Sequence, residues 1–137
     1  MHIIKLLSEI NWLAIVATTV LSFALGALWH SKLLFGNAWA KDSNTIYNSE
    51  NHGNPLIVFG LSAVLHIIVL IGLAMFIGAD SSAMKGLLKG FFVSTFWIST
   101  SIGVTYIFVG RSFRLFLIDA GFYIVFLSLS GLILGAW

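Results

Sequence analysis

Four long apolar segments fill most of this 137-residue chain and decide what it can fold into. They run over Ile10–Trp29, Leu56–Ile77, Leu87–Val109 and Leu115–Trp137. The hydrocarbon core of a bilayer is about 30 Å thick and is crossed by roughly 20 apolar residues in a helix, a length that each segment reaches. Only helices and closed barrels satisfy their own backbone in lipid, and apolar runs without period-two alternation favour helices. The segments therefore predict an integral membrane protein.

The predicted fold class is all-α: a polytopic membrane protein with one domain, a four-transmembrane-helix bundle. The expected helices span about residues 10–30, 55–77, 84–109 and 114–137. Residues 31–54 form the long first loop, and its apolar run Leu33–Trp39 favours a short helix lying in the interface. Asn54 and Pro55 are a start signal for the second helix, with Asn as N-cap and Pro at the first position.

The composition excludes several classes of protein. Hydrophobic residues make up 59% of the chain, charged residues 9%, and the mean hydropathy is +1.02, whereas a soluble domain carries about 25% charged residues. The formal charge of +2 is too small to indicate a nucleic-acid partner. The chain has no cysteine, which excludes disulfides and thiolate chemistry. We expect no cofactor.

Templates for enzymes and metal sites also fail. The chain has no GxSxG motif and no phosphate-binding glycine loop. Its histidines, at positions 2, 30, 52 and 66, lack the spacing of a metal site. Glu9 and Asp80 are expected at the opposite membrane face from Asp119, so no carboxylate pair is indicated. A catalytic role is therefore the least favoured function for this chain.

Charge balance leaves the orientation in the membrane open. Four helices put both termini on the same side, together with Lys5, Lys85 and Lys89. The opposite side receives Lys32, Lys41, Arg111 and Arg114, so the positive-inside rule compares three cations with four. The slight excess favours a cytoplasmic long loop. It also permits dual topology, in which copies insert both ways.

Several stretches of the chain resemble a family of small bacterial membrane proteins, the domain of unknown function 1761 family. They are Asn11–Ala14, Leu25–Trp29, Leu34–Trp39, Gly110–Tyr123 and Gly131–Trp137. The chain departs from the family pattern at His30, where Tyr is expected, and at Lys32, where Pro is frequent. The resemblance covers nearly the whole chain. It implies a four-helix protein of the bacterial cytoplasmic membrane and implies no activity.

Asp119 is the most informative single residue. It lies about one turn inside the fourth helix, and a carboxylate at such a depth is costly unless it faces the bundle or a partner. Arg114, Arg111 and His30 are expected near the same membrane face, so we expect an ion pair with one of the arginines first and with His30 second. The alternatives are an ion- or proton-handling carboxylate and an Asp that reaches the headgroups.

His66 lies near the middle of the second helix, where an imidazole is unusual. The plain interpretation is an interhelical hydrogen bond that holds the bundle, as polar residues do in lipid. Ser62 lies one turn earlier, and the pair of Ser62 with His66 indicates a hydrogen bond rather than a nucleophile. Together with Asp119 and Tyr123, His66 also permits a relay from the interface to the middle of the membrane. Helices one, three and four each carry a polar stripe, and the four helices together predict a polar interior. The candidate ligand or ion path comprises Asp119, Tyr123, His66, His30, Arg114, Arg111, Ser62, Ser101 and Thr105.

Two glycine pairs, Gly86 with Gly90 and Gly131 with Gly135, match the small-xxx-small pattern of close helix contacts. Such ridges serve either contacts inside the bundle or association between copies. Because the chain offers two of them besides its polar stripes, we expect a homo-oligomer in the lipid bilayer.

The leading functional hypothesis is a protein that binds or passes a small solute or ion through its polar interior. The alternative is a non-catalytic accessory or scaffold protein that docks a partner or lipid through its long loop. An intramembrane enzyme acting on a lipid-soluble substrate comes last. A hydrated cavity that reaches Asp119 distinguishes the first hypothesis from the second.

Overall fold

A computed structural model describes residues 2–43 and 54–137, and the regular elements in these ranges are all helices. Their bounds are α1 His2–Ser8, α2 Trp12–Trp29, α3 Gly36–Asp42, α4 Pro55–Ile77, α5 Ala83–Phe92, η2 Val93–Ser99, α6 Thr100–Val109 and α7 Phe113–Ala136. Segments α5, η2 and α6 follow one another without a break, so they form one rod. The expected all-α class with four long helices is confirmed.

Four of these rods are long and apolar enough to cross a membrane: Trp12–Trp29, Pro55–Ile77, Ala83–Val109 and Phe113–Ala136. Their bounds lie within two residues of those expected from the sequence. Asn54 caps α4 by accepting a hydrogen bond from the Leu56 N–H, and Pro55 takes the first position of the helix. Large apolar side chains cover much of the surface, as contact with lipid requires.

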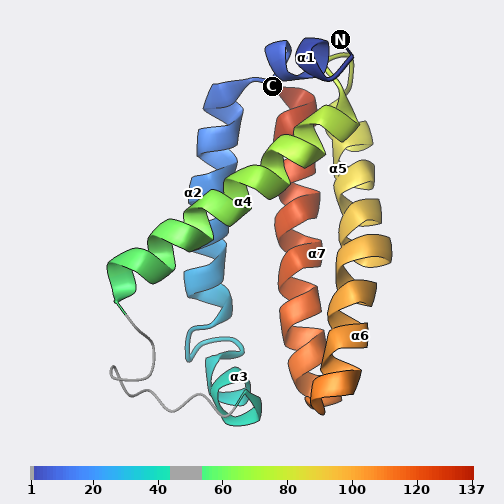
Figure 1. Ribbon diagram of the computed structural model, residues 1–137. Coiled ribbons are helices and arrows are strands. Elements are labelled where there is room, and N and C mark those ends of the chain that lie inside the picture. Colours follow the sequence, from blue (N-terminus) through green and yellow to red (C-terminus); the bar gives the residue numbers. More distant parts are fainter. Residues whose placement is uncertain (1, 44–53) are drawn as a thin grey trace.

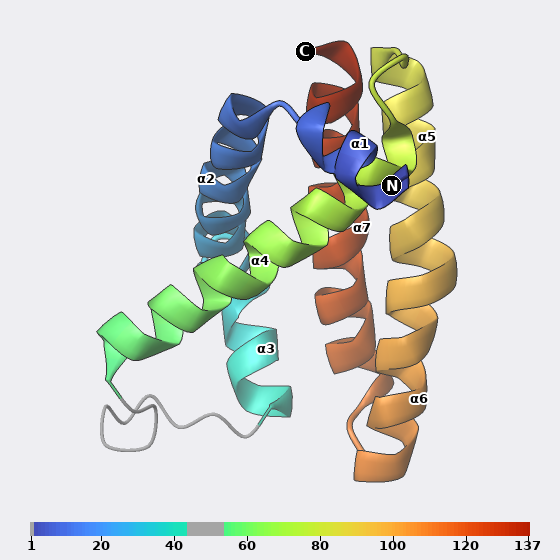
Figure 2. The ribbon, with the colours of Figure 1, turned by 45° about the horizontal axis from the view of Figure 1, so that its top comes forward.

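The rods have unequal inclinations. In Figure 1, α2, α7 and the α5–α6 rod stand side by side, whereas α4 crosses in front of them along a diagonal. The short helix α1 lies across one end of the bundle, where α7 also ends, and α3 lies at the other end. Because α4 is inclined, its C-terminal part packs near α5 and α7 while its N-terminal part stands apart from α6 (Figure 2).

The closest helix contact joins α5 to α7 through the two glycine pairs. A Cβ atom on Gly86 would overlap the carbonyl oxygen of Gly131, and the reverse substitution would overlap that of Gly86. A Cβ on Gly90 would meet the Leu127 carbonyl, and one on Gly135 the Ser82 carbonyl. Both ridges therefore serve one contact inside the chain. The homo-oligomer stays a prediction, but it can no longer rest on these glycines.

A packed core closes the half of the bundle that lies toward α1. Its fully buried members include Leu70 of α4 and Phe126 and Leu127 of α7. Thr18 and Ser94, also fully buried, turn their hydroxyls back to carbonyls of their own helices. These two hydroxyls bond locally, as is common in membrane helices, whereas that of the equally buried Ser130 has no hydrogen-bond partner among the described residues.

Three local features depart from the sequence expectations. The N-terminal tail forms α1, which had not been predicted. The helix of the first loop begins at Gly36 rather than near Leu33, so Leu33 and Leu34 precede it as exposed residues. The third rod contains the π-helical segment η2, in which the Ser99 hydroxyl donates to the Ser94 carbonyl at 2.7 Å. Such segments add a residue to the turn and change the phase of the helix that follows.

Candidate functional site

Asp119 lies on α7, about 9 Å from the start of that helix at 1.5 Å per residue. Its Oδ1 accepts a hydrogen bond of 3.0 Å from the indole N–H of Trp39, and its Oδ2 accepts one from the hydroxyl of Tyr106. Both carboxylate oxygens act as acceptors, which is the pattern of the ionised form. The side chain thus joins α3 and α6 to α7, and both donors are neutral.

The chain reverses after α2, and this reversal brings Trp39 to α7. The amide of Phe35 donates to the carbonyl of Trp29 at 3.1 Å, and that of Gly36 donates to the Ser31 carbonyl at 2.9 Å. Gly36 is required here because a Cβ atom would overlap the carbonyl oxygens of His30 and Ser31. Helix α3 consequently folds back beside the bundle and directs Trp39 to Asp119.

The turn between α6 and α7 brings the second donor to the carboxylate. Gly110 ends α6 with a φ of 81°, a left-handed conformation that favours glycine. Ser112 then caps α7 by accepting a hydrogen bond of 3.1 Å from the Leu115 N–H. This short connection reverses the chain, so Tyr106 and Asp119 face each other across the hairpin.

The expected ion pair of Asp119 with Arg114 or Arg111 is wrong. The Arg114 guanidinium binds both oxygens of Asp42 at 2.5 and 2.8 Å, and Ser112 adds a third bond to the same carboxylate. Arg111 donates to the carbonyl of Ser43 at 3.1 Å. Hydrogen bonds from Arg114 and then Ser112 lower the pKa of Asp42 to about 2. Both arginines therefore hold the end of α3, because the fold-back of α3 places other acceptors beside them.

A group of aromatic rings adjoins Trp39, one of the two donors to Asp119. The His30 ring meets Trp39 edge-on at a centroid distance of 5.2 Å and lies 5.9 Å from Phe122. Trp29 turns inward, where its indole N–H donates to the Ile118 carbonyl at 2.9 Å and its ring lies 4.9 Å from Phe35. Trp29 is therefore a packing residue at this site.

His30 also bonds to its own helix. Its Nδ1 lies 2.9 Å from the Gly26 carbonyl oxygen. Because a carbonyl can only accept, Nδ1 carries the proton, and Nε2 of the neutral ring is free to accept. His30 is thus held in one orientation at the edge of the aromatic group and does not supply the expected ion pair, since no ion pair joins it to Asp119 within the described ranges.

His66 does not continue the path that the sequence permits. Its Nδ1 lies 2.7 Å from the Ser62 carbonyl oxygen and 3.3 Å from the Ser62 hydroxyl. Both contacts lie within α4, so the expected interhelical hydrogen bond is wrong, whereas the hydrogen bond with Ser62 is present. Its ring stands between Phe23 and Phe126, at centroid distances of 5.8 and 5.4 Å. Nε2 is buried and has no hydrogen-bond partner among the described residues. The half-buried His66 therefore packs against two apolar rings, and no described hydrogen bond links it to Tyr123.

The predicted stripe on the third rod is divided by η2. Ser94 is buried, whereas Ser101 and Thr105 are exposed, with their hydroxyls donating to the carbonyls of Trp97 and Ser101. The additional residue in the π turn rotates α6 about its axis relative to α5. A polar stripe predicted for a continuous α-helix therefore no longer stays on one face after Ser99. Ser101 and Thr105 thus lie outside the interior in which the sequence pattern had placed them.

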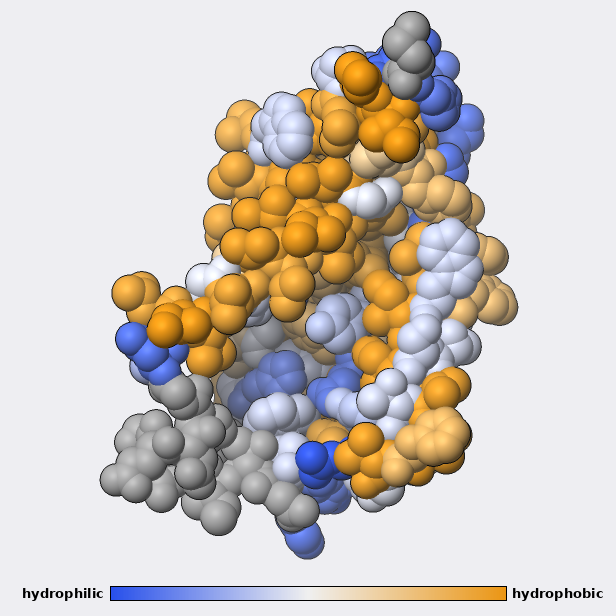
Figure 3. All heavy atoms as spheres, viewed as in Figure 1, coloured by the Kyte–Doolittle hydropathy of each residue, from blue (hydrophilic) through white to orange (hydrophobic). Residues whose placement is uncertain are grey.

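A hollow opens beneath the diagonal of α4 (Figure 3). α6 borders it on one side and α3 lies at its lower end, and hydrophilic side chains are visible in its floor. The polar side chains held together at this junction of α2, α3, α6 and α7 are His30, Trp39, Tyr106 and Asp119. Asp119 joins α7 to α3 and α6, the two helices that border the hollow (Figure 3), so this polar group lies beside it.

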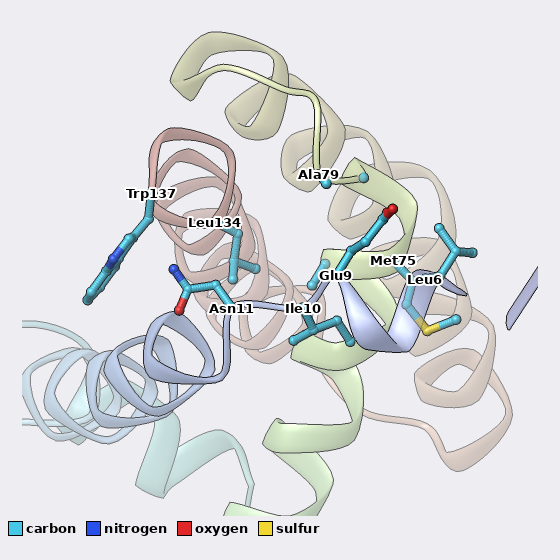
Figure 4. Close-up of a pocket in the computed structure, with 10 residues that line it drawn as sticks. Leu6, Glu9, Ile10, Asn11, Met75, Ala79, Leu134 and Trp137 are labelled. Atoms are coloured by element: carbon cyan, nitrogen blue, oxygen red, sulfur yellow. The ribbon is translucent and has the colours of Figure 1, made fainter. Parts of the chain in front are cut away.

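A separate cavity of about 80 Å³ lies at the opposite end of the bundle, under α1. Glu9, Asn11, Met75 and Leu134 contribute to its walls. In Figure 4, Glu9 and Trp137 lie on opposite sides of Asn11, so the carboxylate and the indole do not meet. Among the described residues, no group of three His, Asp or Glu side chains could hold a metal ion, in this cavity or elsewhere.

Sequence reasoning found Asp119 and His30 but missed Trp39 and Tyr106 as donors to the carboxylate. A signal for Tyr106 existed, since it stands one turn before the end of one helix and the carboxylate less than two turns into the next. Trp39 had no comparable signal, because its position depends on the fold-back of α3.

Comparison with known proteins gives one family. The family model described as "Protein of unknown function (DUF1761)" matches residues 13–135, which is nearly the whole chain. No curated protein and no solved structure matches.

Proposed function

Because the chain belongs to the DUF1761 family, whose members are described only as proteins of unknown function, we infer its function from its own site and propose that it binds a small cationic solute at Asp119. In this proposal the protein resides in a bacterial cytoplasmic membrane. The binding site is the hollow between α4 and α6, and the aromatic rings beside the carboxylate complete it.

One observation carries the proposal: the Asp119 carboxylate has only neutral donors among the described residues. Trp39 and Tyr106 provide one hydrogen bond each, while Arg114 and Arg111 bind Asp42 and Ser43. Two neutral donors stabilise a carboxylate but leave its charge in place. In a membrane-spanning helix such a charge is costly without a cation or water. A cationic ligand would supply the charge that the arginines do not.

The surroundings favour an organic cation over a hydrated metal ion. Metal ions such as Mg²⁺ and Ca²⁺ prefer several oxygen ligands, and the described residues offer one carboxylate at this site. Aromatic faces attract ammonium groups, by about 0.5–2 kcal/mol each depending on desolvation. Trp39 and Tyr106 place their rings beside a single carboxylate, and the His30 ring, which also contacts Phe122, lies against Trp39. One anionic group beside several rings is suited to a small ammonium ion.

The packed core supports binding rather than passage. Leu70, Phe126 and Leu127 are fully buried between the hollow and the α1 end of the bundle. His66, the mid-membrane residue of the relay that the sequence permits, packs against Phe23 and Phe126 and has no described hydrogen bond to Tyr123. A path to the other side would need this core to separate. The proposed activity is therefore reversible binding from the α3 end or from the side.

Equilibrium dialysis of the purified protein against labelled tetramethylammonium tests the proposal. We expect saturable binding of one cation per chain and at least tenfold weaker binding by Asp119→Asn, which keeps an acceptor oxygen for one of its two donors. tert-Butanol, which is similar in shape but neutral, should not compete.

Asp80→Asn is the matched control, since it removes a carboxylate from the exposed turn between α4 and α5. It should bind the cation as the parent protein does. Binding that is equal in all three proteins, or absent from the folded parent, would overturn the proposal. The accessory protein that docks a partner through its loop would then be the better account.

A further inference from the structure

The hollow at Asp119 opens sideways, in the direction that lipid occupies around an upright bundle. α4 packs against α2, α5 and α7, and its inclination carries its N-terminal part away from α6 (Figures 1 and 2). Residues 55–61, the first two turns of α4, are all exposed. Figure 3 looks directly into the opening, along a line across the long axis of α7. A ligand in the hollow can therefore contact lipid as well as Asp119.

The α4 wall beside this opening is apolar, and the α6 wall is of intermediate hydropathy (Figure 3). Leu56, Ile57 and Phe59 of α4 are exposed by 82, 59 and 60%. Figure 3 shows hydrophobic surface along α4 and a band of intermediate hydropathy along the α5–α6 side. The α4 wall is suited to an alkyl chain, whereas the floor is suited to an ammonium head.

We propose that the ligand is a single-chain amphiphilic ammonium compound, with its cationic head at Asp119 and its alkyl chain along the opening between α4 and α6. The inference rests on the proposed function and adds the class of ligand to it. The carboxylate and the rings of Trp39 and His30 would hold the head. The chain would remain in an apolar environment throughout, because wall and bilayer adjoin.

A series of n-alkyltrimethylammonium ions, from methyl to octyl, tests the inference on the full chain in nanodiscs. Each methylene that leaves water contributes about 0.8 kcal/mol, so affinity should rise roughly three- to fourfold per added carbon. This increase in affinity should appear only in the binding that is lost in the Asp119→Asn variant. Asp80→Asn should show the same series as the parent protein.

The outcomes separate the two proposals. Asp119-dependent binding that does not increase with chain length would overturn the inference that the ligand is an amphiphile, and it would leave the proposed cation site intact. An increase that persists unchanged in Asp119→Asn would show partition into lipid alone, which also overturns the amphiphile. Absence of any Asp119-dependent binding, tetramethylammonium included, would remove the proposed function itself.

Octylphosphocholine distinguishes a free amine from a phospholipid headgroup. Its phosphate adds a negative charge close to the ammonium, so we expect at least tenfold weaker binding than for octyltrimethylammonium. Equal affinity would assign the hollow to a zwitterionic lipid and overturn the inference of a cationic ligand.

Discussion

The indole N–H of Trp39 donates a 3.0 Å hydrogen bond to the carboxylate of Asp119, across 80 residues of sequence. This bond joins the short helix of the first loop to the middle of the α6–α7 hairpin. It also occupies the carboxylate with a neutral donor, while Arg114 is held by Asp42. The position of α3 and the charge of the site are therefore coupled.

Trp39→Phe should destabilise the protein and release α3. The substitution keeps an aromatic ring and removes the donor, and a hydrogen bond to a charged group contributes about 1.5–3 kcal/mol. Thermal unfolding in detergent should show the loss. Trp12→Phe is the control, because Trp12 is 53% exposed and has no bond to Asp119. Equal stabilities of the two variants would contradict the role given to Trp39.

Gly86→Leu and Gly131→Leu should each prevent normal packing of α5 against α7. Each new side chain would overlap a backbone carbonyl across the contact, and overpacking of this kind costs about 1–3 kcal/mol or more. Thermal unfolding should therefore show a large loss of stability. Gly60→Ala should be tolerated, since nothing lies within 4 Å of its Cβ position. A stable, folded Gly131→Leu variant with altered association alone would place the ridge between copies instead.

The contact of Asp42 with Arg114 should give acid-sensitive stability. The folded pKa of Asp42, about 2, lies below its ordinary value of 3.8, so the contribution is present above the unfolded pKa. It is lost as pH falls from about 4 through 2. Unfolding temperatures measured across this range should decrease more in the parent than in Asp42→Asn. Parallel decreases in both proteins would show that the pair contributes nothing.

Both termini should be accessible from the same side of the membrane. Helix α1 and the end of α7 lie at one end of the bundle (Figure 1), and four helices return the chain to its starting side. Since the chain has no cysteine, single cysteines placed at His2 and after Trp137 can be labelled with an impermeant reagent. Labelling of the two ends from opposite sides, in a uniformly oriented sample, would exclude this topology.

The long helices could be predicted because length and hydropathy alone determine them in a bilayer. Asn54 and Pro55 marked the start of α4 by local chemistry, which depends on neighbours in sequence. The π turn in η2 could not be predicted, since its seven residues have ordinary helix preferences and gave no signal. Its consequence was large: the phase change moved Ser101 and Thr105 from the expected interior to the surface.

The site was only partly predictable for a similar reason. Asp119 was identifiable by its depth in an apolar helix, which is a local property. Its partners were not, because they depend on where the chain reverses after Trp29. The close approach of Gly36 to His30 and Ser31 turns α3 toward α7. Asp42 therefore binds Arg114, and Trp39 donates its hydrogen bond to Asp119. Sequence proximity suggested Arg114 for Asp119, and tertiary packing gave a different pair.

The most direct test of a cation site at Asp119 compares tetramethylammonium affinity in Asp119→Asn and Tyr106→Phe. The first variant removes the charge, so its Kd should rise at least tenfold, or about 1.4 kcal/mol. The second removes a neutral donor and keeps the ring, so the carboxylate has fewer hydrogen bonds, and the Kd should stay the same or fall. An equal loss of affinity in both variants would contradict the cation site, since it would mean that Asp119 and Tyr106 only hold the fold.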